Sequence, residues 1–335
     1  MTLRALAIFS LIIAVLVPAS AQERVTVGTQ RLSSSAALFL AAAQGYFKAE
    51  GLDLDMTAYP SEQAVAEALA AGTTDFGVTG FTAVAFNLAG KGAIKAIGAQ
   101  VREKRGTEGN ELIASNAAYA KGLHKPEDLA NRSAAISQIG STFHYQFAQI
   151  ARLKGFDLAT VTLKSLQSLD AMVRAVASGE VDAAILPVQY ARELLTANQA
   201  KLIVWTSELD EQQLGALFAS AKTIETRRVT VEKFVRAYRR GAADYATSLL
   251  RHDRYAKRIT DAKSQAAAVA IARYVYPGHP AEKAAATVEA GAYYMDPLAR
   301  LDAADIERQV EWYKSQGLVD QSVDAHAVVD LSFTR

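Results

Sequence analysis

Strand-like and helix-like patterns of apolar residues alternate along residues 25–99. Residues 25–28 are a short β-rich run, and residues 52–59 alternate apolar with polar positions; both patterns are typical of strands. Residues 61–71 carry apolar side chains at helical spacing behind Ser61, which can cap the helix. Strands that alternate with helices indicate βαβ units and predict an α/β fold with a mostly parallel sheet. The same patterns predict helices at 36–49 and 82–88 and strands at 75–78 and 94–99.

A charged, glycine-containing segment at residues 102–110 interrupts the alternation. Such a segment is typical of a connection, and we expect the chain to cross there between two lobes. The alternation then starts again and continues to Trp205. It predicts strands at 111–115, 133–137, 161–163, 181–186 and 202–205, and helices at 125–129, 141–154 and 170–177.

Beyond Trp205 the chain has a helical pattern. Apolar residues from Phe234 to Leu249 recur at helical spacing and predict an amphipathic helix over 231–250. Further helices are expected at 265–274, 281–292 and 303–316, with Gly317 as the stop of the last.

The chain begins with the pattern of an export signal, residues 1–21. Arg4 gives a positive start, and the next thirteen residues are uncharged and mostly apolar. Pro18 breaks this run, and Ala19-Ser20-Ala21 is a small-residue cleavage site. The run is shorter than the roughly 20 residues that span a bilayer, although an anchor or a core helix is the alternative. We therefore expect a cleaved protein that works in a bacterial periplasm.

Composition narrows the class of function. A chain of 335 residues, 50% hydrophobic and 21% charged, suits two compact soluble domains. The net charge of +1 falls to zero when Arg4 is removed, so the mature chain has no strong field for nucleic acid or an anionic membrane. The absence of cysteine excludes cysteine nucleophiles, thiolate metal sites and a lipid-attachment cysteine.

Motifs for catalysis are missing. No pair among the five histidines has the spacing of a helical zinc site, and neither a P-loop nor a G-x-S-x-G elbow is present. No nucleophile stands beside a base in the sequence. We therefore predict a binding protein rather than an enzyme, with no cofactor and no metal.

Four loops at predicted strand ends lead into helices, at residues 28–35, 78–82, 137–144 and 186–190. Ligands of open parallel sheets bind at the carboxyl ends of strands, where such loops gather. Helix N-termini there offer unpaired N–H groups and partial positive charge, which suit an anionic group. The candidate contacts are Gln30, Arg31, Ser34, Thr79, Gly80, Phe81, Thr82, Ser137, Gly140, Ser141, Thr142, His144, Pro187, Gln189, Tyr190 and, at the return crossing, Trp205.

Each candidate also has a purely structural interpretation. The hydroxyl residues could be plain helix caps, and Arg31 a solvated surface charge. His144 could be an ordinary first-turn residue, and Phe81 and Tyr190 could belong to the core. Trp205 could line the cleft or pack the hinge. The prediction rests on the recurrence of these loops in both lobes.

An ordered set of short motifs resembles the exported substrate-binding proteins of ABC importers. The likeness is greatest to the branch for sulfonates, taurine, nitrate and thiamine-pyrimidine precursors, which has the type 2 periplasmic binding fold. It fades beyond about residue 210. The motifs are Gly28-Thr29-Gln30, Gly45-Tyr46-Phe47, Glu50-Gly51-Leu52, Ala68 to Gly72, Asp75 to Gly80, Lys125 to Leu129, Gly140 to His144 and Gly179 to Ala183.

The resemblance implies a two-lobe clamshell whose lobes each hold a mostly parallel sheet flanked by helices, with extra C-terminal helices. One lobe would hold residues 24–101 and 206–335, and the other residues 102–205. Gln30, Thr79, Gly80, Ser141 and Thr142 would be the best contacts, with ligand between the lobes. Asp182 would position a turn.

The chain departs from sulfonate and taurine binders at Leu186-Pro187-Val188, where they tend to have an aromatic residue, an acid or Asn, and Pro. This leaves an aromatic or heterocyclic ligand open, with Phe81, Tyr190 or Trp205 as stacking surfaces.

The resemblance implies a monomeric receptor that captures a small, anionic organic solute and delivers it to an inner-membrane permease. Two alternatives remain at this point. One is a sensor subunit that presents its ligand to a membrane kinase. The other is an enzyme like thiamine-pyrimidine synthase, which the lack of cysteine and the export signal disfavour.

Overall fold

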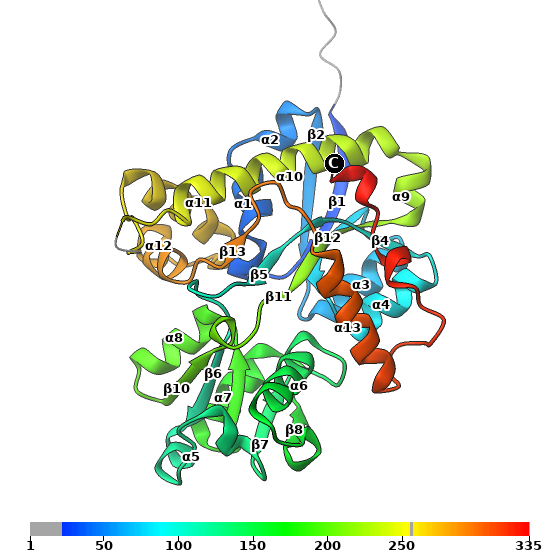
Figure 1. Cartoon of the computed structure of the whole chain (residues 1–335). Helices are drawn as coiled ribbons and strands as arrows, with labels where there is room; N and C mark the ends of the chain where they lie inside the picture. Colours follow the sequence, from blue (N-terminus) through cyan, green and yellow to red (C-terminus); the bar gives the residue numbers. More distant parts are fainter. Residues whose placement is uncertain (1–21, 255–256, 335) are drawn as a thin grey trace, which may run out of the picture.

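Two five-stranded sheets organise the α/β architecture of the computed structural model, which describes residues 22–254 and 257–334 (Figure 1). We call each sheet with its helices a lobe. The expected export signal at residues 1–21 lies outside the described residues. No helix in the described part of the chain is long and apolar enough to cross a membrane.

The sheet of the first lobe has the strand order β2-β1-β3-β12-β4. Four strands run in one direction, and β12 runs antiparallel between β3 and β4, so the sheet is mixed. Its strands are β1 (Glu23–Thr29), β2 (Leu52–Ala58), β3 (Phe76–Gly80), β4 (Ile94–Ala99) and β12 (Gly215–Ser220).

Strand β12 corrects the prediction that the chain after Trp205 is helical. All six of its residues are buried, because β12 lies inside the sheet with helices on both faces. A strand buried on both faces is a continuous apolar run and lacks the alternation by which strands are recognised in a sequence.

The second lobe repeats this design with the strand order β10-β6-β9-β7-β8. Here β6 is the antiparallel strand, between β9 and β10. In both lobes the antiparallel strand is the first one after the chain enters from the other lobe. The strands are β6 (Glu111–Ser115), β7 (Ser133–Ile136), β8 (Thr162–Ser165), β9 (Ala183–Leu186) and β10 (Ala200–Trp205).

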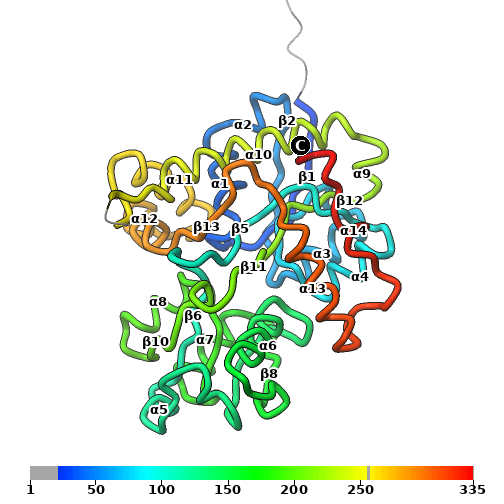
Figure 2. The backbone as a smooth tube through the Cα atoms, in the orientation of Figure 1, coloured from blue at the N-terminus to red at the C-terminus, as the bar shows by residue number. Residues whose placement is uncertain are grey.

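Helices flank both sheets, and the tube in Figure 2 shows the C-terminal helices returning to the first lobe. That lobe holds α1 (Ala36–Ala43), α2 (Tyr46–Ala49), α3 (Glu62–Ala70), α4 (Ala83–Gly90), α9 (Ala221–Thr226), α10 (Arg228–Leu249), α11 (Ala262–Val275), α12 (Ala281–Ala290), α13 (Ala303–Ser315) and α14 (Ala325–Val328). The second lobe holds α5 (Asn116–Ala120), α6 (Thr142–Lys154), α7 (Leu169–Ser178) and α8 (Val188–Thr196). Short 3₁₀ helices are η1 (Ser33–Ser35), η2 (Pro126–Leu129), η3 (Leu158–Thr160), η4 (Thr206–Glu208) and η5 (Leu331–Phe333).

The predicted helix over 36–49 is divided in two. Gly45 has a φ of 72°, a left-handed conformation that glycine adopts without strain, and the chain turns there between α1 and α2.

A small sheet of three short strands joins the lobes, in the order β11-β5-β13. The chain enters the second lobe after β5 (Val101–Glu103) and returns through β11 (Gln212–Gln213); the third strand is β13 (Tyr294–Met295). The buried Glu103 carboxylate accepts hydrogen bonds near this crossing from the Asn110 backbone N–H at 2.9 Å, Gln146 at 3.0 Å and Thr206 at 2.7 Å. Burial raises the pKa of Glu103 to about 7, and these donors oppose the rise.

Phe234 of α10 anchors the core of the first lobe. It is fully buried, and its ring lies 3.8 Å from Phe76 and 4.7 Å from Phe47, centroid to centroid. We expect Phe234→Ala to lower the free energy of unfolding by about 3–5 kcal/mol, the typical cost of emptying an aromatic core site. Val229→Ala on the same helix, where the side chain is 64% exposed, should change it by less than about 0.5 kcal/mol. Urea denaturation measures both, and equal effects would contradict this packing.

Candidate ligand-binding site between the lobes

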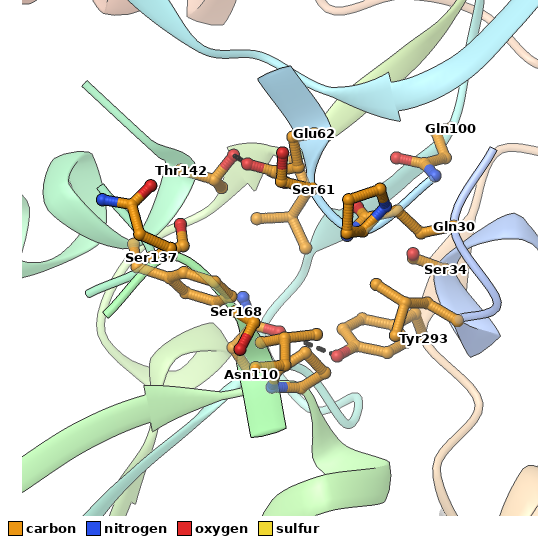
Figure 3. A pocket seen from close by; sticks show the side chains of 17 residues that line it. Gln30, Ser34, Ser61, Glu62, Gln100, Asn110, Ser137, Thr142, Ser168 and Tyr293 are labelled. Carbon is orange, nitrogen blue, oxygen red and sulfur yellow. Dashed lines mark hydrogen bonds between the residues drawn. The ribbon is translucent and has the colours of Figure 1, made fainter. Parts of the chain in front are cut away.

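A cavity of about 50 Å³ lies between the lobes and takes its walls from both (Figure 3). Typical small-molecule pockets measure about 300–1,000 Å³, so the lobes lie close together in this structure. From the first lobe and the joining sheet come Gln30, Leu32, Ser34, Pro60, Ser61, Glu62, Gln100, Leu214 and Tyr293. From the second lobe and its entrance come Asn110, Ser137, Thr142, Phe143, Gln167, Ser168, Leu169 and Pro187.

Several helices begin at the cavity wall. Ser61 caps α3 by accepting the Ala64 N–H, and Ser168 caps α7 in the same way. Thr142 is the first residue of α6, and Pro187 is the N-cap of α8. Because the first N–H groups of a helix have no partner within it, these helix starts bring partial positive charge to the cavity from both lobes.

The remaining walls combine amides with apolar groups. Gln30, Gln100, Asn110 and Gln167 provide uncharged donors and acceptors. Leu32, Pro60, Phe143, Leu169 and Leu214 provide apolar surface. Among the described residues that line the cavity there is no lysine and no arginine. The helix starts described above bring partial positive charge to this wall, and Arg31 lies in the neighbouring cavity.

Glu62 is the one acidic side chain on this wall. It is the first residue of α3, and the Thr142 hydroxyl donates toward both of its carboxylate oxygens, at 3.0 and 2.9 Å, across the gap between lobes. Glu62 is half-buried at the cavity, and its carboxylate lies against Gly80 and Thr142. This burial raises the pKa of Glu62 to about 7, and hydrogen bonds from the Thr142 side chain and backbone oppose the rise.

Direct contacts between the lobes surround the cavity. The Ser33 N–H donates to the Gln189 side-chain oxygen at 2.9 Å, and the Ala83 N–H donates to the Gly140 carbonyl at 2.9 Å. The Tyr313 hydroxyl donates to the Ser141 carbonyl at 3.0 Å. These bonds join the start of α6 and of α8 to the first lobe.

The candidates from the sequence fall into three groups. The first lines the cavity and consists of Gln30, Ser34, Ser137, Thr142 and Pro187.

A second group stands directly behind the wall. The Thr79 hydroxyl donates to the Glu62 carbonyl at 3.1 Å. Gly80 leaves the space that the Glu62 carboxylate fills, because a Cβ there would come within 2.0 Å of Glu62 Oε1. Ser141 and Thr82 cap α6 and α4, and Gln189 makes the bond to Ser33 described above.

The third group lies away from the cavity. Phe81 is a core residue stacked on Phe86, with centroids 5.3 Å apart. The Gly140 N–H donates to His144 Nδ1, and the His144 ring meets the edge of Trp312 on a separate groove beside α6.

Arg31 and Tyr190 line a neighbouring cavity of about 210 Å³. It shares five wall residues with the main one, namely Gln30, Leu32, Pro60, Ser168 and Leu169. Trp205 ends β10 and is not among the described residues that line the cavity.

Sequence reasoning missed several residues of the wall. Ser168 had a usable signal, since it directly precedes the helical pattern at 170–177. Glu62 had none, because an acidic residue in a first helical turn is ordinary. Tyr293 comes from the C-terminal region, and its hydroxyl reaches Asn110 Oδ1 at 2.7 Å. Among the described residues no cluster of His, Cys, Asp or Glu could hold a metal ion.

Solved structures of low sequence identity share this fold. The ligand-binding component of an ABC-type import system from Staphylococcus aureus matches with a TM-score of 0.72 and 14% identity, over 93% of this chain and 98% of that one. The aliphatic sulphonate binding protein SsuA from Escherichia coli gives 0.69 and 16%, over 92% of each chain. The desulfurization enzyme DSZB gives 0.58 and 15%, over 93% and 97%. These likenesses establish the periplasmic-binding-protein fold.

At the level of sequence, no curated protein matches the chain. A family model described as NMT1/THI5 like matches residues 33–248, which include both crossings between the lobes and most of the cavity wall. Since this match covers more than half of the sequence, the chain belongs to the NMT1/THI5-like family.

Proposed function

We propose that this protein is the solute-binding component of an ABC importer, exported to the periplasm as a monomer. It captures a small organic solute with an acid group, such as a sulfonate, a carboxylate or an aromatic or heterocyclic acid. It then delivers the solute to a membrane permease. One observation carries the proposal, namely the cavity between two lobes at which helices of both lobes begin.

Hinge closure is the proposed mechanism. Residues 102–205 move against 24–101 and 206–335 about the joining sheet, where the chain crosses only at β5 and β11. A solute that touches helix starts of both lobes binds the closed form better than the open form and shifts the population toward it. The permease distinguishes the closed shape.

Binding without turnover is part of the proposal. The chain has no cysteine, and no histidine is among the described residues that line the cavity. His144 accepts the Gly140 backbone N–H and lies on the separate groove beside α6, away from this cavity. The apolar wall suits the hydrocarbon or ring part of the solute.

A thermal-shift panel tests this function. It includes alkane- and arenesulfonates, nitrate, carboxylates, aromatic acids, pyrimidines and flavins. A ligand at 100 times its Kd should stabilise the protein by about 2.7 kcal/mol, because it binds only the folded state. Stabilisation by one chemical class of acid supports the proposal, and no response from any acid in the panel would contradict it.

Ser168→Asp tests the role of the helix starts. Asp is as good an N-cap as Ser, so α7 should remain folded, but its carboxylate adds negative charge at the wall of the cavity. We expect affinity for an anionic solute to fall at least tenfold while the melting temperature stays within a few degrees. Ser168→Asn is the matched control, since it caps the helix without charge. An equal loss with both variants would refute the electrostatic role of this helix start.

A further inference from the structure

The acid group expected of the solute has a competitor inside the protein. The Glu62 carboxylate already accepts hydrogen bonds from the hydroxyl and the backbone of Thr142, which is the first residue of α6. An ionised solute that reached these donors would place a second negative charge beside the first. Like charges that share a site disfavour each other strongly, and one of them then keeps a proton.

We infer that Glu62 determines the charge specificity of the site, so that an ionised acid binds at the start of α6 only together with one proton. The inference rests on the proposed function and deepens it. The proton comes from solvent and neutralises the Glu62 carboxylate as the solute enters. The Thr142 donors then turn to the solute, and the protonated Glu62 can donate its O–H to an oxygen of the same acid group. No covalent bond changes.

Among the described residues, no lysine or arginine pairs with Glu62 or is among the groups that shift its pKa. From α6, Thr142 faces the carboxylate as a neutral donor, and His144 lies on the separate groove beside that helix. From α13, Tyr313 is fully buried, and Glu62 is among the groups that raise its pKa. From β3, Gly80 presents only backbone.

The position of Glu62 is also fixed. Its carboxylate fills the space beside Gly80, and its backbone carbonyl accepts the Thr79 hydroxyl. Moving the Glu62 side chain away would therefore empty the space beside Gly80 and break its contact with Thr142. Proton uptake relieves the repulsion without rearranging the wall.

The test uses benzenesulfonate, which stays ionised throughout the measured range, so any pH dependence belongs to the protein. We expect its Kd for the wild type to be flat below pH 7 and to rise about tenfold per pH unit above it, since the free carboxyl titrates near 7. Calorimetry at pH 8 in two buffers of different ionisation enthalpy should show uptake of one proton per sulfonate bound.

Glu62→Gln removes the charge at nearly constant shape. Its Kd should stay flat to pH 8.5 and should be at least tenfold lower than that of the wild type there. Glu67→Gln, an exposed change on the same helix, is the matched control and should keep the wild-type profile. If Glu62→Gln does not fold, the proton count on the wild type decides alone.

The outcomes separate this inference from the proposed function. A wild-type Kd independent of pH with no proton uptake would overturn the role of Glu62 while leaving solute capture intact. The same pH profile in Glu62→Gln would overturn it too. Tighter binding of the sulfonate at high pH would mean that another group controls the site. No binding of benzenesulfonate to either protein at any pH would overturn the inference for sulfonates, and the thermal-shift panel decides separately whether the site takes any acid.

Discussion

Unpaired backbone N–H groups at helix starts are the constraint on which this architecture depends. A helix cannot satisfy its own first donors, and Ser61 and Ser168 supply only part of what α3 and α7 require. The two sheets direct several such starts to one gap, so helix N-termini of both lobes lie around the same small volume. In the proposed function, a solute with acceptor atoms there would contact both lobes at once, which would link its binding to their approach.

The joining region and the cavity share a second property, the burial of carboxyl groups. Glu103 beside the crossing and Glu62 in the cavity both have pKa values raised from 4.5 to about 7 by burial. The unfolded chain loses these protons at lower pH than the folded one. Each group therefore makes the folded state less stable as the pH rises from about 4.5 through 7.

The sequence predicted the strands that alternate with recognisable helices and missed a strand that lies outside this alternation. The strand–helix alternation through residue 205 predicted the strands of both sheets other than β12. Ser61, Ser141 and Thr82 are the N-caps of α3, α6 and α4. Strand β12 was missed because a short apolar run cannot be told from a helix segment by its period alone, and it stands in a region of helical pattern. The equally buried β3, β6 and β9 were recognised in the region where strands and helices alternate. Phe81 lies in the core, although it follows a strand end as the cavity residues do. Glu62 and Tyr293 become parts of the site only through contacts between distant segments, which no local pattern records.

The distance between the lobes, with and without solute, tests the central claim most directly. The natural chain has no cysteine, so Thr57→Cys on β2 and Arg174→Cys on α7, both at exposed positions, accept spin labels cleanly. Pulsed electron–electron double resonance measures the distance between the two spin labels. We expect a broad distance distribution without solute. Addition of an acid that stabilises the protein should shift it to one shorter, narrower distance. An unchanged distribution with saturating solute would contradict closure of the two lobes on their ligand.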